Sequence, residues 1–361
     1  MDGPIAVARR LNQKRVTKDG SAVDGWRAAN ARRIVTIILA GCGLAVCLAL
    51  DVSTGPAMLP IGAVISALTG SSSDPMLNAI VWSLRLPIAL MAIAVGASLG
   101  ISGAVMQTIL NNPLASSYTL GISAGAGFGA ALVILFGAAL PLPEIWSIPI
   151  AAFAFAGVAC ALVAGVGRMR GATPELLVLA GIACLFLFQA LLSLLQFLAS
   201  PEALQQIVFW LFGSLLRASL GKVAIVSLVL AIVLPMLLAD AWRLTALQLG
   251  DERAGALGVR VRSLRLRAFV VVSLLTGAAV AFVGTIGFIG LVAPHIARML
   301  VGEDQRHLLP ASAVFGALLL SAASVASKLI IPGTVFPIGI VTALIGVPFF
   351  GWLVFATGRR R

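Results

Sequence analysis

The segment from Arg85 to Gly129 reads RLPIALMAIAVGASLGISGAVMQTILNNPLASSYTLGISAGAGFG, and it decides the fold class of this chain. No Lys, Arg, Asp or Glu occurs between Leu86 and Pro143. An α-helix needs about 20 apolar residues to cross the hydrocarbon core of a membrane. The stretch therefore predicts two membrane-spanning helices, joined by a polar but uncharged loop at 111–117.

The whole chain has the composition of an integral membrane protein. Of its 361 residues, 60% are hydrophobic and only 11% are charged, and the mean hydropathy is +1.08. Residues 1–33 are polar and contain Asp beside Arg and Lys, so we expect a basic cytoplasmic tail rather than a cleaved signal peptide. Residues 34–358 then form one transmembrane domain. The net charge of +12 does not indicate nucleic-acid binding, because the charge lies in loops between apolar segments.

The four cysteines predict no metal site. Each lies inside an apolar run, and no CxxC or CxxH spacing occurs in the sequence. Small residues that pack in a core or against lipid are the simpler interpretation.

Hydropathy and loop charge together predict ten helical segments with both termini in the cytoplasm. Placing the N-terminus inside puts 21 of the 25 Lys and Arg residues on the cytoplasmic side, as the positive-inside rule requires. Segments 51–78 and 199–222 then lie outside, and both are long enough to contain helices at the membrane surface. The predicted segments are 34–50, 79–110, 119–139, 146–167, 176–198, 223–240, 268–284, a short one at 286–300, 309–328 and 336–356.

Glycines at helical spacing predict close contacts between helices. Gly96 and Gly100 are four residues apart, and Gly121, Gly125 and Gly129 repeat that spacing in the next segment. Helices in lipid associate where small residues let their backbones approach. We therefore expect both sets to lie at packing seams of the bundle.

The run 284–294 predicts an interruption of the helix. It contains three glycines spaced three residues apart and then Pro294, a combination that weakens a helix. We expect a broken or shortened helix here, near a functional seam. His295 follows directly, and we expect it to be structural or hydrogen-bonded rather than a ligand for haem or iron.

The cytoplasmic segment 244–267 is far longer than a turn requires. It contains a predicted short helix at 251–257, which begins with Asp251 and Glu252 and is followed by Gly258, a residue suited to a C-terminal cap. A solvated loop would explain the charges alone. The order of acidic, small and apolar residues favours instead a helix that lies on the cytoplasmic face and offers a docking site to a soluble partner.

With these features the chain resembles the permease subunits of ABC importers for iron–siderophore complexes, haem and cobalamin, which have an all-α fold with ten spans per subunit (type II importers). The resemblance covers about residues 34–358, and many blocks in the same order carry it. The blocks are RLP at 85–87, SGA at 102–104, Gln107, NPLA at 112–115, LG at 120–121, SAGA at 123–126, LGDE at 249–252, LGV at 257–259, GFIGLV at 287–292, PH at 294–295, Arg298, Gly302, Asp304, Arg306, LLP at 308–310, PIGIVTALIG at 337–346 and PFF at 348–350.

The resemblance implies roles for three groups of residues. Segment 249–262 would be the coupling helix that docks on an ATPase, through Gly250, Asp251, Glu252, Ala254, Leu257, Gly258 and Val259. Two loops would be cytoplasmic gate elements, at Asn112, Pro113 and Leu114 and at Thr173 and Pro174. Arg85 and Lys328 would meet acidic residues of a binding protein on the outer face. The chain departs from the family pattern at Ile88, Val335 and Lys328, where members often have Arg, Glu and Arg, so the partner at that face stays open.

The resemblance also implies the partners. The chain would work with a pair of ABC ATPase subunits, a second permease subunit (the same chain or a paralogue) and an extracytoplasmic binding protein, in the bacterial inner (cytoplasmic) membrane. It has no GxxxxGK[ST] loop, so we expect no enzymatic activity and no bound cofactor, with ATP and Mg²⁺ used by the partner ATPase. A ferric siderophore is the expected cargo, and haem and cobalamin are the alternatives.

Two other classes of membrane protein fit the sequence less well. A secondary transporter driven by protons or sodium usually places ionisable groups within the bilayer. Here Asp51, Asp240 and His295 lie only near the ends of predicted spans. An intramembrane enzyme would need paired carboxylates, a Ser/His arrangement or a metal cluster within a span, and the predicted spans contain none.

Overall fold

Long apolar helices dominate the computed structural model, which describes residues 30–56, 58–137, 143–331 and 334–358. Within these ranges, seven helices have the length and composition to cross a membrane and three shorter apolar helices accompany them. Every one of the ten predicted segments coincides with one of these helices. In chain order they are the N-terminal helix Asn30–Ser53, α4 (Leu86–Ile109), α5 (Ile122–Phe136), α6 (Glu144–Arg170), α7 (Pro174–Leu198), α9 (Leu220–Ala239), α12 (Val261–Val283), α13 (Ile289–Val301), α14 (Gln305–Leu329) and α15 (Ile338–Gly358).

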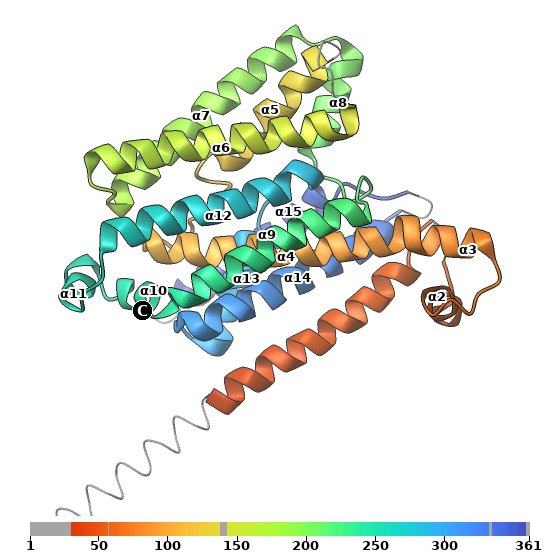
Figure 1. Ribbon diagram of the computed structural model, residues 1–361, viewed down its shortest axis with the longest axis horizontal. Helices are drawn as coiled ribbons and strands as arrows, with labels where there is room; N and C mark the ends of the chain where they lie inside the picture. The colour runs from red at the N-terminus through yellow and green to blue at the C-terminus, as the bar shows by residue number, and fades with distance from the viewer. Residues whose placement is uncertain (1–29, 57, 138–142, 332–333, 359–361) are drawn as a thin grey trace, which may run out of the picture.

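The remaining helices are short and lie at the two ends of the bundle. One end, which we call the basic end, carries α10 (Ala241–Leu247) and α11 (Asp251–Ala256). The other end, which we call the opposite end, carries α2 (Ile61–Leu68), α3 (Pro75–Ile80), the π-helix η1 (Val81–Arg85) and α8 (Pro201–Leu211). The predicted excursions 51–78 and 199–222 are thus partly helical. Figure 1 shows the bundle with the basic end to the left and the opposite end to the right.

Helix α4 is the central helix of the larger layer. It is packed by α9, α12, α13 and α14, and the hydrophobic window of its span is 89% buried. A Cβ on Gly96 or Gly100 would overlap the backbone of α14 at Gly316 or Ser312. Gly96 and Gly100 therefore lie where the backbones of α4 and α14 touch. A larger residue at either position would prevent the two helices from packing this closely.

Helices α5, α6 and α7 form a second layer, seen at the top of Figure 1. A Cβ on Gly125 would lie 2.7 Å from the Phe155 carbonyl oxygen of α6, and one on Gly129 would overlap the Ala151 carbonyl oxygen of the same helix. Gly121 has φ +81°, and its position faces the backbone of α7 at Leu185. All three glycines therefore stand at backbone contacts within this layer.

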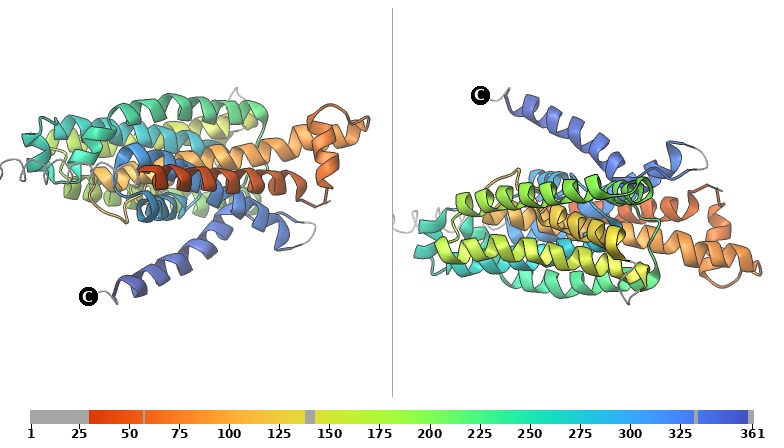
Figure 2. Two further views of the ribbon diagram at one scale, coloured as in Figure 1. Left: turned by 90° about the horizontal axis from the view of Figure 1, so that it is seen from below. Right: turned by 90° about the horizontal axis from the view of Figure 1, so that it is seen from above.

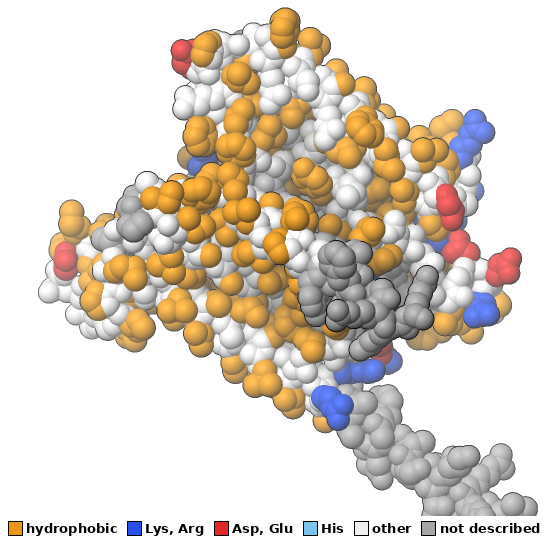
Figure 3. Space-filling model, turned by 180° about the vertical axis from the view of Figure 1, so that it is seen from behind, with side chains coloured by type: hydrophobic (Ala, Val, Ile, Leu, Met, Phe, Trp, Pro, Cys, Tyr) orange, Lys and Arg blue, Asp and Glu red, His pale blue; other side chains and the backbone are white. Residues whose placement is uncertain are grey.

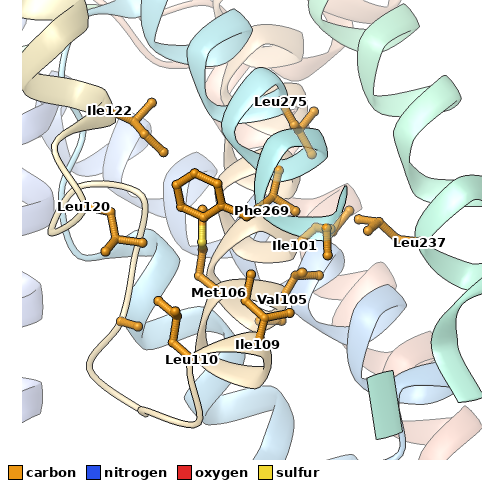
Figure 4. Packing of buried hydrophobic residues seen from close by; sticks show 14 of the residues in the cluster. Ile101, Val105, Met106, Ile109, Leu110, Leu120, Ile122, Leu237, Phe269 and Leu275 are labelled. Atoms are coloured by element: carbon orange, nitrogen blue, oxygen red, sulfur yellow. The ribbon is translucent and has the colours of Figure 1, made fainter. Parts of the chain in front are cut away.

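The two layers join around the C-terminal half of α4. Figure 4 shows Met106 and Ile109 of α4 beside Phe269 of α12, with Leu120 and Ile122 approaching from the start of α5. Phe269, Met106 and Ile109 have 0% exposure. Close packing of these side chains holds the loop between α4 and α5 at the junction.

The helix interruption predicted at 284–294 is present. Helix α12 ends at Val283, Gly284 has φ +77°, and α13 begins at Ile289 after Phe288, which has φ +66°. The unwound backbone is bonded to other chain segments, because the amide of Ser214 donates to the Val283 carbonyl at 2.7 Å. The amide of Gly339 donates to the Phe212 carbonyl at 3.0 Å and so brings the start of α15 to the same place.

The distribution of charge fits a membrane-spanning bundle. Figure 3 shows hydrophobic side chains across the middle of one face and charged side chains toward its two ends. Helix α15 leans away from the bundle on the face opposite α9, as both views of Figure 2 show. The N-terminal helix is only 11% buried over its apolar window. Both helices therefore present apolar surface to lipid or to another protein.

Candidate functional site

Helix α11 projects from the basic end and is bounded by glycines in unusual backbone conformations. Gly250 has φ +97° and Gly258 has φ +84°, which are conformations that side chains with a Cβ rarely adopt. The amide of Val259 donates to the Ala254 carbonyl at 3.0 Å, and the amide of Gly258 donates to the Gly255 carbonyl at 2.9 Å. This pair of bonds is a Schellman motif, the C-terminal cap that Gly258 predicted.

The exposed side of α11 mixes charge with apolar surface. Asp251 and Glu252 are exposed in its first turn, whereas Ala254 and Val259 are buried against the bundle. Leu249 and Leu257 flank the helix and are 53% and 51% exposed. Two exposed leucines thus flank a charged helix at the basic end of the bundle.

Arg265 connects α11 to the interior of the bundle. This residue of α12 has a side chain that is only 3% exposed, and its Nη1 and Nη2 donate to the two carboxylate oxygens of Asp251 at 3.0 and 2.6 Å. Its Nε donates to the Ile109 carbonyl at 2.7 Å, and its Nη1 also donates to the Ala172 carbonyl at 2.9 Å. A bidentate Arg–carboxylate pair fixes geometry as well as distance.

Ile109 is the last residue of α4. Only Leu110 and Asn111 separate it from the predicted gate loop at Asn112, Pro113 and Leu114. In that loop Asn111 has φ +45°, and the Asn112 side chain accepts from the Leu114 amide at 2.9 Å. Pro113 and Leu114 are exposed at the basic end. The Asn112 bond makes an Asx turn that fixes the shape of the loop.

The second predicted gate element begins where Arg265 makes its other carbonyl contact. Ala172 has φ +54° and 0% exposure. Thr173 caps α7 by accepting from the Leu176 amide at 3.4 Å, and Pro174 is the first residue of that helix. Through a single guanidinium group, the structure therefore joins the predicted coupling helix to the residues that precede the two predicted gate elements.

Sequence reasoning missed Arg265. It is one of six basic residues in 243–267, and a positive-inside loop explains such a run without any special role. Nothing in its local pattern separates it from Arg262 or Arg267, which are exposed. Only the fold reveals that its partners lie 14, 93 and 156 residues away.

A second polar network holds the last turn of α4. Gln107 accepts from Arg298 of α13 at 3.0 Å, and Thr108 accepts from the Gln305 side chain of α14 at 2.8 Å. Arg298 also pairs with Glu303 at 2.9 Å. Hydrogen bonds from Arg306 lower the pKa of Asp304, so this carboxylate stays ionised and caps α14. Three successive residues of α4, 107–109, are thus bound by three different helices.

A cavity of about 710 Å³ lies between residues 116–119, the unwound segment and α15. Its polar groups include Ser116, Tyr118, Thr119 and Thr285, and its apolar walls come mainly from α15. None of its lining residues is Lys, Arg, Asp, Glu or His. The cavity is therefore apolar to mildly polar, as the low charge of the spans predicts.

At the opposite end, the predicted docking residues Arg85 and Lys328 are buried, which corrects the expectation that they present charge on the surface. The Lys328 side chain is 2% exposed and its Nζ lies 2.6 Å from Asp51 Oδ1, which itself has 0% exposure. Arg85 is 7% exposed and donates to the Thr54 carbonyl. Lys328 and Arg85 therefore bind the end of the N-terminal helix instead of facing outward. The expectation failed because loop charge locates a cation on one side of the membrane without giving its depth.

Arg217 is an exposed cation at this end, whereas Lys222 is 5% exposed and donates to the Arg217 carbonyl at 2.9 Å. His295 lies in α13 with its ring centroid 6.1 Å from that of Phe349, an edge contact consistent with a structural role. Among the described residues, no group of three or more His, Cys, Asp or Glu side chains is arranged to hold a metal ion.

Comparison with known proteins gives consistent results. Residues 43–356 match the FecCD transport family. The chain is 37% identical to the hemin transport system permease protein HmuU of Yersinia pestis over 81% of this chain and 87% of that one. It is 34% identical to the iron(3+)-hydroxamate import system permease protein FhuB of Bacillus subtilis, over 96% and 89%. It is 37% identical to the vitamin B12 import system permease protein BtuC of Vibrio parahaemolyticus, over 75% and 81%.

The fold has a counterpart among solved structures. A metal-chelate type ABC transporter in an inward-facing conformation superposes with a TM-score of 0.79 and 31% identity, covering 89% of this chain and 99% of the other.

Proposed function

The chain belongs to the FecCD transport family, and we propose that it is the translocation subunit of an ATP-driven importer whose cargo is a ferric siderophore. It is a multi-pass membrane protein and a transport component. In the proposal the basic end faces the cytoplasm of a bacterial cell, with both termini on that side. Two permease subunits, either this chain twice or this chain with a paralogue, would enclose the pathway.

One observation carries the proposal, namely that Arg265 binds Asp251 together with the Ile109 and Ala172 carbonyls. If an ATPase grips α11, any displacement of that helix pulls on Asp251. The same guanidinium then transmits the displacement to the end of α4 and to the start of α7. A docking helix tied to two gate loops is what an ATP-driven gate requires.

The mechanism follows from that connection. ATP binding and hydrolysis in the partner subunits would favour different positions of α11, and so shift the population between outward-open and inward-open states. This chain would contribute the transport pathway and the Arg265 connection that transmits the movement of α11. The partner ATPase would bind ATP and Mg²⁺. Leu249 and Leu257 supply the apolar part of the proposed contact with the ATPase.

The choice of cargo rests on the chemistry of the cavity and on the named relatives. Relatives are named for iron–hydroxamate, hemin and vitamin B12 transport, all of which are large ligands that bring their own metal coordination. The uncharged lining of the cavity offers no ionic group that would hold such a ligand tightly. We favour the siderophore, and haem and cobalamin are the competing cargoes.

Uptake measurements test the proposal. A strain that lacks this chain, with and without its restoration, would be offered iron-loaded siderophores, haem and cobalamin separately. We expect ATP-dependent accumulation of a ferric siderophore only in the restored strain. Accumulation of haem or cobalamin alone would identify that ligand as the cargo in place of the siderophore. If uptake of none of the three depends on the chain, the proposed range of cargoes is wrong or a partner subunit is missing, and a pull-down of partners would follow.

The outer docking surface is reassigned to the exposed part of the opposite end. We propose that Arg217 takes the electrostatic role first given to Arg85 and Lys328, in contact with an acidic residue of a binding protein. Arg217→Glu should weaken docking more at low salt than at high salt, because salt screens exposed charges. Docking affinity that is unchanged at both salt concentrations would remove Arg217 from the interface.

A further inference from the structure

A groove between α6 and α12 opens at the basic end and has a volume of about 930 Å³. Its walls are apolar, with Leu266 and Val270 on α12 and Ala161 and Ala164 on α6. Gly165 supplies the space, because a Cβ built there would meet no atom within 4 Å. The α6 wall from Ala161 to Arg168 spans about 10 Å, so the groove extends from the mouth into the apolar part of the span.

The mouth of this groove is strongly basic. Arg168, Arg260 and Arg262 line it and are exposed, and the described residues provide no acidic partner for any of them. Arg262 donates to the Arg168 carbonyl, a bond that ties the end of α6 to the start of α12. Arg267 also lines the mouth, and it shares Asp240 with Arg243. Within the part of the chain that the structure describes, the groove therefore ends in three arginines without an acidic partner.

We propose that this groove binds one anionic phospholipid molecule, with its phosphate among Arg168, Arg260 and Arg262 and an acyl chain against Leu266 and Val270. The basic groups and the apolar walls are in the order that such a lipid requires, with charge at the level of the headgroups and hydrocarbon below it. Basic pockets between membrane helices at this level attract anionic headgroups. A zwitterionic lipid would fit the walls and offer the same phosphate, but the positive charge on its headgroup would be repelled by the arginines.

A soluble protein fits the groove less well than a lipid does. The ATPase proposed to grip α11 could reach Arg260 and Arg262 at the mouth. It could not reach the walls at Ala161 and Val270, which lie within membrane-spanning helices. The surface around those walls is hydrocarbon, so acyl chains are the groups available to fill it.

The groove also lies away from the apolar surface of α15. Helices α6 and α12 face the viewer in Figure 1, and Figure 2 shows α15 departing from the opposite face. A second permease subunit that packed against α15 would leave the groove open to the bilayer. The bound lipid would then brace α12, the helix that carries Arg265.

Native mass spectrometry of the full-length chain in detergent tests the proposal, with phosphatidylglycerol and phosphatidylcholine of equal chain length as probes. We expect one phosphatidylglycerol to bind at least about tenfold more tightly than phosphatidylcholine, since each arginine at a membrane surface contributes about 1 kcal/mol. Arg168→Gln and Arg262→Gln should each weaken phosphatidylglycerol binding by about fivefold on the same scale. Gly165→Leu should fill the groove and weaken the binding of both lipids, because it removes the space for an acyl chain and leaves the arginines in place.

Two matched variants separate the groove from general charge attraction. Arg170→Gln removes an exposed arginine in the same helical turn that does not line the groove, and it should leave the tight site intact. Gly157→Leu places the same side chain on α6 at another glycine with open space, and it should bind phosphatidylglycerol normally. Equal effects of Arg168→Gln and Arg170→Gln, or of the two leucine variants, would overturn the proposal. So would Arg262→Gln if it abolished association with the ATPase but not lipid binding.

Discussion

Arg265 shows how one buried cation can serve several chain segments. Its guanidinium is satisfied by one carboxylate and two backbone carbonyls, and the carboxylate partner Asp251 is itself 48% exposed at the side chain. The pair is therefore buried on the bundle side and open on the α11 side. A force applied to α11 acts on the arginine through a charged, bidentate contact rather than through soft apolar packing.

We predict that Arg265→Met uncouples transport from ATP hydrolysis. The substitution keeps an unbranched stem but leaves the buried Ile109 and Ala172 carbonyls without this donor, at a cost of about 2–4 kcal/mol in the free energy of unfolding. ATP hydrolysis by the assembled importer should continue while substrate uptake per ATP falls. Arg265→Lys should restore stability in part, because one ammonium cannot reach all three partners.

Arg170→Gln is the control, since Arg170 is exposed at the basic end and lies outside α11. Reconstituted vesicles in which ATP hydrolysis and uptake are measured together provide the readout. If Arg265→Met lowers ATP hydrolysis and substrate uptake in proportion, Arg265 stabilises the fold and does not transmit movement from α11 to α4 and α7.

The Asp51–Lys328 pair gives a second prediction at this scale. Lys328→Met should reduce the free energy of unfolding by about 3–5 kcal/mol, because it leaves a buried carboxylate unpaired. The double variant Asp51→Asn with Lys328→Met should recover a large part of that loss. Thermal unfolding in detergent measures both. Additive effects of Asp51→Asn and Lys328→Met would show that the two residues are not coupled.

At the scale of the element, α11 depends on its two flanking glycines more than on its own contacts. It is only six residues long, so helix propensity contributes little and the caps decide whether it forms. Gly258 closes the Schellman motif with positive φ, and no atom lies within 4 Å of a Cβ built there. A substitution at this position is therefore penalised by backbone conformation alone.

Gly258→Ala should loosen α11 by about 1–2 kcal/mol, the cost of a left-handed conformation for a residue with a Cβ. Gly255→Ala is the matched control, because Gly255 lies inside the helix, also has open space around its Cβ position, and should become a better helix former. Hydrogen exchange of the α11 amides should speed up in the first variant and slow down in the second. Equal exchange in both would show that the cap does not control this helix.

At the scale of the whole molecule, much of the fold was readable from the sequence. All ten apolar segments, the helix break after Val283 and the short helix before Gly258 lie where hydropathy and glycine placement predict them. These features are local, since a span needs only length and apolarity and a cap needs only one glycine. Arg265, Arg85 and Lys328 were missed or misplaced because their partners are distant in the sequence.

Orientation gives a prediction for the entire bundle. In a cysteine-free background, a cysteine at Arg170 on the basic end should react with a membrane-impermeant thiol reagent only from the cytoplasm. A cysteine at Arg217 on the opposite end should react only from outside. Labelling of both from the same side, or the reverse pattern, would contradict the positive-inside assignment.

The buried Asp51–Lys328 pair also has a consequence for biosynthesis. The two residues are 277 positions apart, so at about 5–20 residues per second the ribosome delivers Lys328 roughly 14–55 s after Asp51. Arg85 emerges much sooner and can accompany the carboxylate in the meantime. The N-terminal helix therefore enters the membrane before its buried partner has been synthesised. Its ion pair with the bundle forms only after α14 has been inserted, so this contact is one of the last to form during assembly.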